Sequence, residues 1–313
     1  MTEMTEVIKS VKDIIKRHSL TQRDVAAEAG ISEGQMSAVL NGKYTGDNGR
    51  AAELLSVWLD GFRQRQALPD MSGFVETPTS RQLRDAFTFA RAAGCMSTIV
   101  GTPGVGKTES ALQYCAENRA NTWMITLSPS RCSLTECLLE LAEELGLPDR
   151  RRNKGSLSRG ICRRLRGTRG LIIIDEADHL GVDGLEEFRA IQDATHVGMV
   201  LIGNPQGVLK PIDSRYATDE LERLCSRIAR PVTLKKAKKA DVTALAEAWG
   251  ITGDSELKLV YSIAARAGAL RVLSHTLRQA WILARGAEAD SLSESHIRQA
   301  FKEVYGKDLS LKS

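Results

Sequence analysis

Hydrophobic positions follow two different patterns along this chain. Near the start, Val7, Val11 and Ile14 recur at helical spacing, and apolar residues recur in the same way after residue 241. Between these parts, apolar and β-branched residues form short continuous runs, as is typical of buried parallel strands. The runs lie at residues 97–100, 122–127, 171–174 and 198–203. The pattern therefore predicts a helical beginning, an α/β middle and a helical end.

These changes of pattern predict several domains. Residues 1–66 are expected to form a helical domain, followed at 67–79 by a linker rich in Pro, Gly and polar residues. Residues 80–230 contain all four strand-like runs, so we expect an α/β core built on a parallel sheet. Residues 231–313 contain four short amphipathic segments separated by glycines, which predict a four-helix lid.

The first predicted strand leads into a glycine-rich loop. Residues 101–108 read GTPGVGKT, which fits the phosphate-binding pattern G-x-x-x-x-G-K-[ST], and a helical segment follows. Glycines let several backbone amides converge on one anion at the start of that helix. Lys107 is then expected to reach the β- and γ-phosphates, and the Thr108 hydroxyl to hold Mg²⁺. The predicted nucleoside triphosphate site consists of Gly101, Thr102, Pro103, Gly104, Val105, Gly106, Lys107, Thr108 and Glu109.

Two later strands end in polar residues that complete this site. Asp175 and Glu176 follow the third run, where the first carboxylate is expected to hold Mg²⁺ with Thr108 and the second to polarise the attacking water. Asn204 follows the fourth run and is expected to orient that water. The set resembles the AAA+ ATPases, in which Asn204 would be sensor 1. We therefore predict an α/β AAA+ core with a P-loop and a parallel sheet.

Further residues are candidates at the edge of the ATP site. Arg227, with Arg223 as the second choice, resembles the finger that AAA+ proteins insert into a neighbour's site. A solvated basic helix end is the alternative. Arg271 resembles the sensor 2 arginine near the start of a lid helix. Phe74 and Val75 either line the adenine pocket or anchor the linker on the core.

The N-terminal domain has the signals of two short helices joined by a turn. Thr21 predicts the start of the first helix, Gly30 its end, and Ser32 the start of the second. This order resembles the helix-turn-helix of phage repressors. The residues expected to face outward or nearly so are Glu33, Gln35, Met36 and Ser37, with Gln35 and Ser37 as DNA contacts.

The charge of this N-terminal domain does not favour tight DNA binding. Residues 1–65 hold nine basic and nine acidic side chains, whereas proteins that read the major groove usually bring positive charge to the DNA backbone. Any DNA contact is therefore expected to be weak, with little sequence preference. A helix-turn-helix that serves protein contacts, or only the fold, is the alternative.

The net charge of only +4 means that nucleic-acid binding depends on local patches. The segment 150–166 contains eight basic residues and no acid, which predicts contacts with DNA phosphates. Its basic residues are Arg150, Arg151, Arg152, Lys154, Arg159, Arg163, Arg164 and Arg166. The second cluster is Lys235, Lys236, Lys238 and Lys239, which suits DNA, an acidic partner or a solvated loop equally.

Composition argues against several other classes. The six cysteines are scattered without a C-x-x-C pair, so we expect neither a disulfide framework nor a zinc site. The apolar runs are too short to span a membrane, and the polar, acidic residues 1–6 do not fit a secretory signal. A cytoplasmic protein, without a membrane partner, is expected.

Several segments together resemble the phage Mu transposition protein B family, the AAA+ target-DNA activators of Mu-like phages and prophages. The segments are NGKYTGDN (41–48), FVET (74–77), GTPGVGKTE (101–109), WMITLSPS (123–130), LIIIDEADHL (171–180), SRIAR (226–230) and KKAKKADV (235–242). The resemblance covers nearly the whole chain. It implies an ATP-dependent protein of the bacterial host cytoplasm that binds double-stranded DNA with little sequence preference and assembles on it as helical filaments.

The same resemblance implies a role in target selection and target immunity during DNA transposition. The protein would capture target DNA for a Mu-type transposase and stimulate strand transfer. DNA and transposase would stimulate its ATP hydrolysis, which clears the filament from DNA near the ends of the element.

Three other functions fit parts of the sequence. A DEAD-box helicase would explain the letters at 175–178, but no Ser-Ala-Thr follows the next strand and no second core fits. A helicase-loader-type AAA+ ATPase shares the ATP-site residues, and the helix-turn-helix ahead of the core argues against it. A helix-turn-helix regulator with incidental ATPase activity is disfavoured by the complete ATP site. A DNA-stimulated ATPase assay separates these functions.

Overall fold

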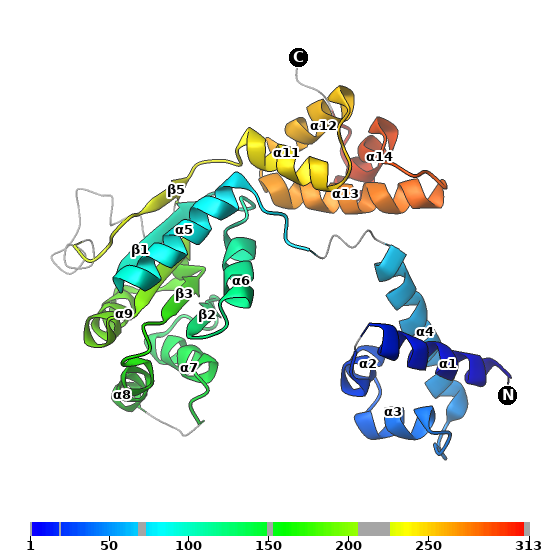
Figure 1. Ribbon diagram of the computed structural model, residues 1–313, viewed down its shortest axis with the longest axis horizontal. Helices are drawn as coiled ribbons and strands as arrows, with labels where there is room; N and C mark the ends of the chain where they lie inside the picture. Colours follow the sequence, from blue (N-terminus) through cyan, green and yellow to red (C-terminus); the bar gives the residue numbers. More distant parts are fainter. Residues whose placement is uncertain (1, 19, 68–72, 149–152, 206–225, 310–313) are drawn as a thin grey trace. The chain divides into compact units, whose positions relative to one another are not determined.

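The computed structural model describes residues 2–18, 20–67, 73–148, 153–205 and 226–309. The chain divides into two compact units, Met1–Ser72 and Gly73–Ser313 (Figure 1). Residues 67–79, the predicted linker, therefore contain the division between them. No helix in the described ranges is long and apolar enough to cross a membrane.

Within its described residues, the smaller unit is a bundle of four helices around one apolar core. They are α1 (Thr2–Arg17), α2 (Gln22–Ala29), α3 (Glu33–Leu40) and α4 (Asn48–Ala67). The Thr21 hydroxyl accepts the Asp24 N–H at 3.1 Å and caps α2, which Gly30 ends with a φ of 69°. The Ser32 hydroxyl caps α3 by accepting the Gln35 N–H at 3.2 Å. These predicted helix boundaries are confirmed.

The prediction that Met36 faces outward is wrong. Its side chain is fully buried, because Met36, Val39 and Leu40 lie on one face of α3 and pack into the core of the smaller unit. Gln35 is exposed and Ser37 is half-buried. The outward face of α3 is therefore narrower than the sequence suggested.

The larger unit is built on a parallel sheet with the strand order β2-β3-β4-β1-β5. The strands are β1 (Met96–Gly101), β2 (Thr122–Thr126), β3 (Leu171–Asp175), β4 (Gly198–Gly203) and β5 (Val232–Leu234). The four predicted strands are confirmed, and the sequence did not reveal β5. Because β4 lies between β1 and β3, its carboxyl end falls between the phosphate loop and Asp175.

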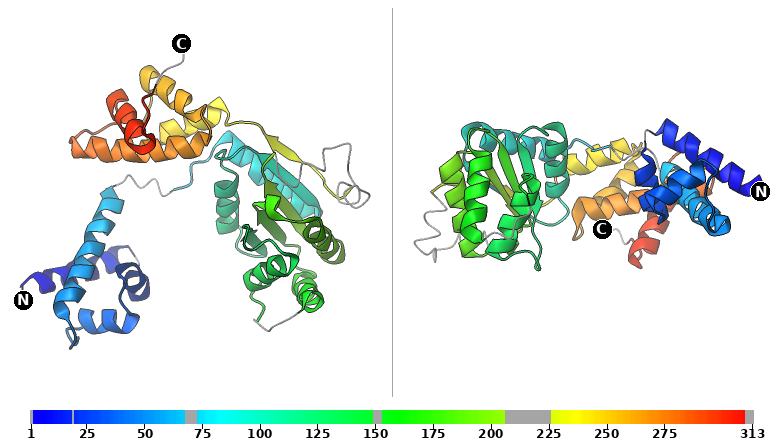
Figure 2. Two further views of the ribbon diagram at one scale, coloured as in Figure 1. Left: turned by 180° about the vertical axis from the view of Figure 1, so that it is seen from behind. Right: turned by 90° about the horizontal axis from the view of Figure 1, so that it is seen from below.

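Helices cover both faces of this sheet (Figure 2). They are α5 (Pro78–Ala93), α6 (Lys107–Glu117), α7 (Leu134–Glu144), α8 (Lys154–Leu165) and α9 (Val182–Thr195). The helices α5 and α6 pack on one face through Phe87 and Tyr114, whereas α7, α8 and α9 pack on the other through Leu138, Ile161 and Phe188. A short 3₁₀ turn, η1 (Ala177–His179), follows β3. The result is a three-layer α/β/α core.

Four helices follow the sheet and coincide with the segments predicted for the lid. They are α11 (Lys239–Ala248), α12 (Asp254–Ala264), α13 (Ala269–Gly286) and α14 (Glu294–Tyr305). The fully buried Asp241 accepts the N–H and hydroxyl of Thr79 at 2.9 and 2.7 Å, which ties α11 to the start of α5. Because a buried carboxylate is stable only when hydrogen-bonded, this contact fixes where the lid joins the core.

Candidate nucleotide-binding site

The glycine loop runs from the end of β1 to the start of α6. Gly104 and Gly106 have φ values of 82° and 91°, in the left-handed region that favours glycine. The Leu270 N–H donates to the Gly104 carbonyl at 3.0 Å, so the start of α13 contacts the loop directly. A Cβ on Gly104 would overlap the Gly268 carbonyl oxygen. The close approach of the lid to this loop therefore requires glycine at position 104.

We expect Gly104→Ala to lose more unfolding stability than Gly106→Ala. Both substitutions place a Cβ on left-handed backbone, at about 1–2 kcal/mol each, but a Cβ at Gly106 meets nothing within 4 Å. Only the variant at 104 also pushes against the lid. Thermal unfolding and nucleotide affinity of the two variants measure the difference. Equal losses in both would show that the lid contact contributes nothing.

Lys107 is nearly buried at the start of α6. Its Nζ donates to the Gly101 carbonyl at 2.5 Å and to Asn204 Oδ1 at 3.4 Å. Burial lowers the pKa of Lys107 from its ordinary value, while the Asp175 and Glu176 carboxylates act in the opposite direction. A bound nucleotide would offer Lys107 Nζ a charged phosphate oxygen in place of the Gly101 carbonyl and Asn204 Oδ1. Such a charge-assisted hydrogen bond is what the predicted phosphate-binding role of Lys107 requires.

The two predicted magnesium ligands lie side by side. The Thr108 hydroxyl donates to Asp175 Oδ2 at 2.7 Å, and Asp175 is only 2% exposed. A hydroxyl and a carboxylate are the hard oxygen ligands that Mg²⁺ prefers, with phosphate oxygens and waters filling the remaining positions. These residues therefore fit the predicted ion.

Glu176 turns the chain away from the sheet immediately after Asp175. It has a φ of 52° and is half-buried. Left-handed backbone at a residue other than glycine is strained, and such strain is common at functional sites. The Glu176 carboxylate therefore lies next to the predicted magnesium ligand Asp175 and stays partly exposed to solvent.

Asn204 follows β4 and faces Lys107. Its backbone N–H donates to Asp178 Oδ2 at 2.6 Å, a hydrogen bond that the sequence did not reveal. Asp178 belongs to the turn after β3, so this bond joins two neighbouring strand ends. The predicted place of Asn204, between the phosphate loop and Asp175, is confirmed by the strand order.

The remaining ATP-site candidates lie at its rim. Arg271 is the third residue of α13 and directly follows Leu270, whose N–H contacts the Gly104 carbonyl of the loop. Arg227 is 51% exposed in its side chain and pairs with Asp193 of α9 at 3.0 Å. Arg223 lies outside the described residues. Phe74 and Val75 are half-buried just ahead of α5, and their part in an adenine pocket stays a prediction.

Most of the predicted DNA-contacting residues in the described part of the larger unit are exposed. On α8 and at its end these are Lys154, Arg159, Arg163, Arg164 and Arg166. The Arg164 guanidinium lies over the Trp123 ring, 5.7 Å from its centroid, so this residue also has a packing role. Arg150, Arg151 and Arg152 lie outside the described residues.

The second basic cluster is exposed as well, but two of its lysines have partners. Its members are Lys235, Lys236, Lys238 and Lys239. Lys238 Nζ donates to Gln82 Oε1 at 2.8 Å, and Lys239 Nζ lies 5.1 Å from the centre of the Tyr261 ring. The structure therefore leaves Lys235 and Lys236 as the members more available for a partner.

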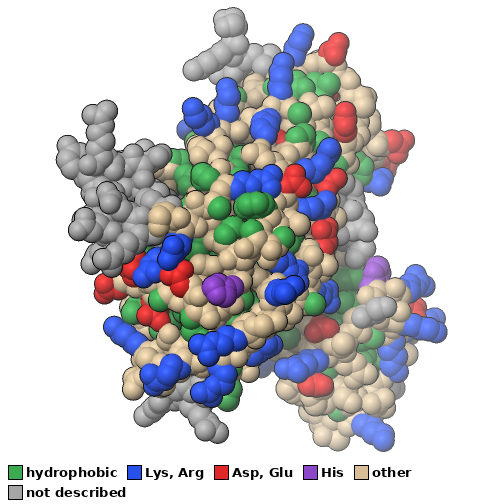
Figure 3. Space-filling model, turned by 60° about the vertical axis from the view of Figure 1, so that its left-hand side comes forward, with side chains coloured by type: hydrophobic (Ala, Val, Ile, Leu, Met, Phe, Trp, Pro, Cys, Tyr) green, Lys and Arg blue, Asp and Glu red, His purple; other side chains and the backbone are tan. Residues whose placement is uncertain are grey.

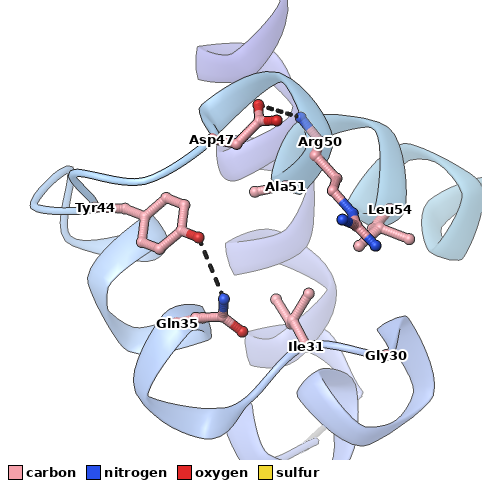
Figure 4. A pocket seen from close by; sticks show the side chains of 8 residues that line it. All are labelled: Gly30, Ile31, Gln35, Tyr44, Asp47, Arg50, Ala51 and Leu54. Carbon is pink, nitrogen blue, oxygen red and sulfur yellow. Dashed lines mark hydrogen bonds between the residues drawn. The ribbon is translucent and has the colours of Figure 1, made fainter.

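The amide of Gln35 is engaged at both ends within the smaller unit. Its Oε1 accepts the Ser32 N–H at 3.0 Å, and its Nε2 donates to the Tyr44 hydroxyl at 3.2 Å. Figure 4 shows Gln35 and Tyr44 on the wall of a cavity of about 390 Å³, opposite Arg50. Each end of the amide keeps one further hydrogen-bonding site, and DNA contact by Gln35 and Ser37 stays a prediction.

Comparison with known proteins gives the family. The family model described as "Mu B transposition protein, C terminal" matches residues 226–304, and an AAA domain model matches residues 91–210. The chain is 44% identical over 301 residues to the ATP-dependent target DNA activator B of Escherichia phage Mu, covering 96% of each chain. It is 42% identical over 272 residues to the Mu-like prophage FluMu DNA transposition protein B of Haemophilus influenzae, covering 86% of this chain and 94% of that protein.

Solved structures agree with this fold. The ORC1 protein of Aeropyrum pernix, in complex with DNA, is 19% identical with a TM-score of 0.57. The match covers 77% of this chain and 69% of the ORC1 chain. The ORC2 protein of the same organism is 15% identical with a TM-score of 0.58. The match covers 79% of this chain and 73% of the ORC2 chain. These likenesses show the AAA+ fold alone. The identity to the phage and prophage proteins shows more, and the chain belongs to the Mu B transposition protein family.

Proposed function

We infer that this protein is an ATPase that binds target DNA in an ATP-dependent manner and activates it for DNA transposition. The observation that carries this inference is the convergence of Lys107, the Thr108–Asp175 pair and Asn204 at one edge of the sheet. A relative that is 44% identical over nearly the whole chain is named an ATP-dependent target DNA activator.

Each residue of the site has a role in hydrolysis. The loop amides and Lys107 bind the β- and γ-phosphates, and Asn204 holds the attacking water beside them. Glu176 polarises that water. Thr108 and Asp175 would hold Mg²⁺, which would supply positive charge to the phosphate oxygens. Arg271 adds a positive charge from the lid, so closure of α13 over the loop completes the site.

The partners follow from charge and from the resemblance. Double-stranded DNA binds with little sequence preference, because exposed arginines on α8 contact phosphates and not bases. ATP-bound subunits associate as helical filaments, in which Arg227 of one subunit serves the ATP site of its neighbour. The Mu-type transposase receives the captured DNA and stimulates hydrolysis.

A DNA-stimulated ATPase assay tests this function. Turnover is expected to be slow alone and to rise with any duplex DNA, irrespective of sequence. A Lys107→Ala variant is the control, since it lacks the phosphate contact and should show no turnover. Wild-type turnover that ignores DNA would argue instead for a regulator with incidental ATPase activity.

A further inference from the structure

The amino-terminal ends of the strands meet at the edge of the sheet opposite to the ATP site. A parallel sheet brings the loops that precede its strands together there. The described loop residues directly ahead of the strands are 94–95, 118–121, 166–170, 196–197 and 227–231, and none of these residues is Asp or Glu. We call this surface the amino edge. Its basic residues are Arg119, Arg166, Arg169, His196, Arg227 and Arg230, with Arg91 from the last turn of α5. Arg227 pairs with Asp193 of α9.

The basic residues of the amino edge are accessible. Arg119, Arg166, Arg169 and Arg230 are exposed, and no carboxylate among the described residues forms an ion pair with them. Figure 3 shows one face of the molecule on which Lys and Arg side chains lie on several sides of a histidine, with Asp and Glu side chains to one side. A cleft of about 890 Å³ is lined in part by Arg91, Arg169 and His196.

Three of these basic residues occupy strained backbone. Arg169, His196 and Arg230 have φ values of 47°, 54° and 52°, where glycine would fit more easily. The chain thus keeps a basic side chain at three loop positions where the local conformation favours glycine. Backbone outliers of this kind cluster at functional sites, although the Arg230 guanidinium also donates to the Asp85 carbonyl and lies over the Phe89 ring.

Neutralisation of helix ends does not account for this charge. The helices α5, α6, α8 and α9 end here at Gly94, Asn118, Arg166 and His196, and each helix end carries about half a negative charge. Four ends contribute about two negative charges, whereas the amino edge has five arginines besides Arg227, which pairs with Asp193. A clear positive excess remains, and it faces solvent.

We propose that the amino edge binds the phosphodiester backbone of DNA, as a continuation of the basic face of α8. Arg163 and Arg166 lie on the last turn and the end of α8, and the following loop leads directly to Arg169. The DNA path then extends from α8 along the strand ends. This inference rests on the proposed DNA binding and adds the surface that carries it.

The test replaces Arg119 by Ala and Arg169 by Gly in the full-length protein. With ATP present, duplex affinity should fall, and the slope of log K against log salt should become shallower by about 0.9 for each DNA phosphate that is no longer neutralised. Arg169→Gly also relieves the left-handed strain, so thermal stability should not decrease. DNA binding would thus weaken without loss of folding.

Arg81→Ala is the matched control. Arg81 is an exposed arginine near the opposite end of α5, beside Glu76, and its loss should leave the salt slope unchanged. An unchanged slope in the Arg119 and Arg169 variant, with normal wild-type binding, would overturn the role of the amino edge. Failure of the wild type to bind DNA would overturn the proposed function itself.

A second inference concerns Asp178. Its Oδ2 accepts the Asn204 N–H at 2.6 Å, while its Oδ1 is buried and has no hydrogen-bond partner among the described residues. A Cβ on Gly203 would lie 2.6 Å from that Oδ1. A buried oxygen without a partner costs stability, so it is retained where function needs the group.

We propose that Asp178 is a positioning residue that fixes Asn204 for contact with the γ-phosphate. Its bond to the Asn204 N–H sets the end of β4, and so keeps Asn204 Oδ1 at 3.4 Å from Lys107 Nζ. The residue would act through Asn204 and not on the phosphate. This proposal rests on the proposed ATPase activity.

A double-mutant cycle tests this role. Asp178→Ala and Asn204→Ala should each lower kcat about tenfold or more, and the double variant should be no worse than Asn204→Ala alone. Each of the two single variants should also bind ATP and ADP with more similar affinities than the wild type does. Asp178→Asn keeps an acceptor for the N–H and should retain most activity. Losses that multiply in the double variant, or unchanged kcat in Asp178→Ala, would overturn the proposal.

Discussion

Glu176→Gln is expected to bind ATP and DNA normally but to hydrolyse ATP about 10²- to 10⁴-fold more slowly, the usual contribution of a positioned general base. The amide keeps the size and the hydrogen-bonding reach of the carboxylate but cannot take a proton from water. Because Lys107, Thr108 and Asp175 are untouched, nucleotide affinity should hold. DNA complexes formed with ATP should therefore persist instead of dissociating.

The measurement is single-turnover hydrolysis beside equilibrium binding of ATP and duplex DNA. Glu143→Gln is the matched control, since Glu143 is an exposed carboxylate on α7 and its loss should change neither quantity. Rapid hydrolysis by Glu176→Gln would remove Glu176 from the proposed role. Loss of ATP binding would mean that the residue supports the structure of the site.

Arg227→Ala is expected to lower DNA-stimulated turnover about 10³- to 10⁵-fold, as for other arginines supplied in trans. The Arg227 guanidinium is half-exposed and pairs with Asp193 in the same subunit. Exposed pairs of this kind contribute only about 0–1 kcal/mol, so the guanidinium is easily released to a neighbour. ATP affinity of the isolated subunit should not change.

Mixing the two variants separates a trans role from a cis role. In a mixed assembly, a Glu176→Gln subunit supplies Arg227 to a neighbour that has lost its own arginine but retains Glu176. Turnover should then rise well above that of either variant alone. No recovery on mixing, with normal assembly on DNA, would contradict action in trans.

The ATP site was largely predictable because its signals are local. Gly101–Thr108 and the Asp175–Glu176 pair are short segments, and Asn204 follows an obvious strand. A parallel sheet then brings the strand ends together without further information. Capping residues such as Thr21 and Ser32 fixed helix starts for the same reason, since each acts within three residues.

The features that the sequence did not reveal depend on distant contacts. The strand β5 has only three residues and is defined by pairing with β1. The burial of Met36 depends on how α3 packs, and the Asp178–Asn204 bond spans 26 residues. The approach of Gly268 to Gly104 joins the lid to the phosphate loop. No local pattern specifies such pairs.

Sizing of the protein on plain duplex DNA, with ATP, with ADP and without nucleotide, shows whether its assembly on target DNA depends on ATP. We expect large assemblies that need both ATP and DNA, and their loss with ADP. A monomer that binds DNA equally in all three conditions would contradict ATP-dependent activation of target DNA.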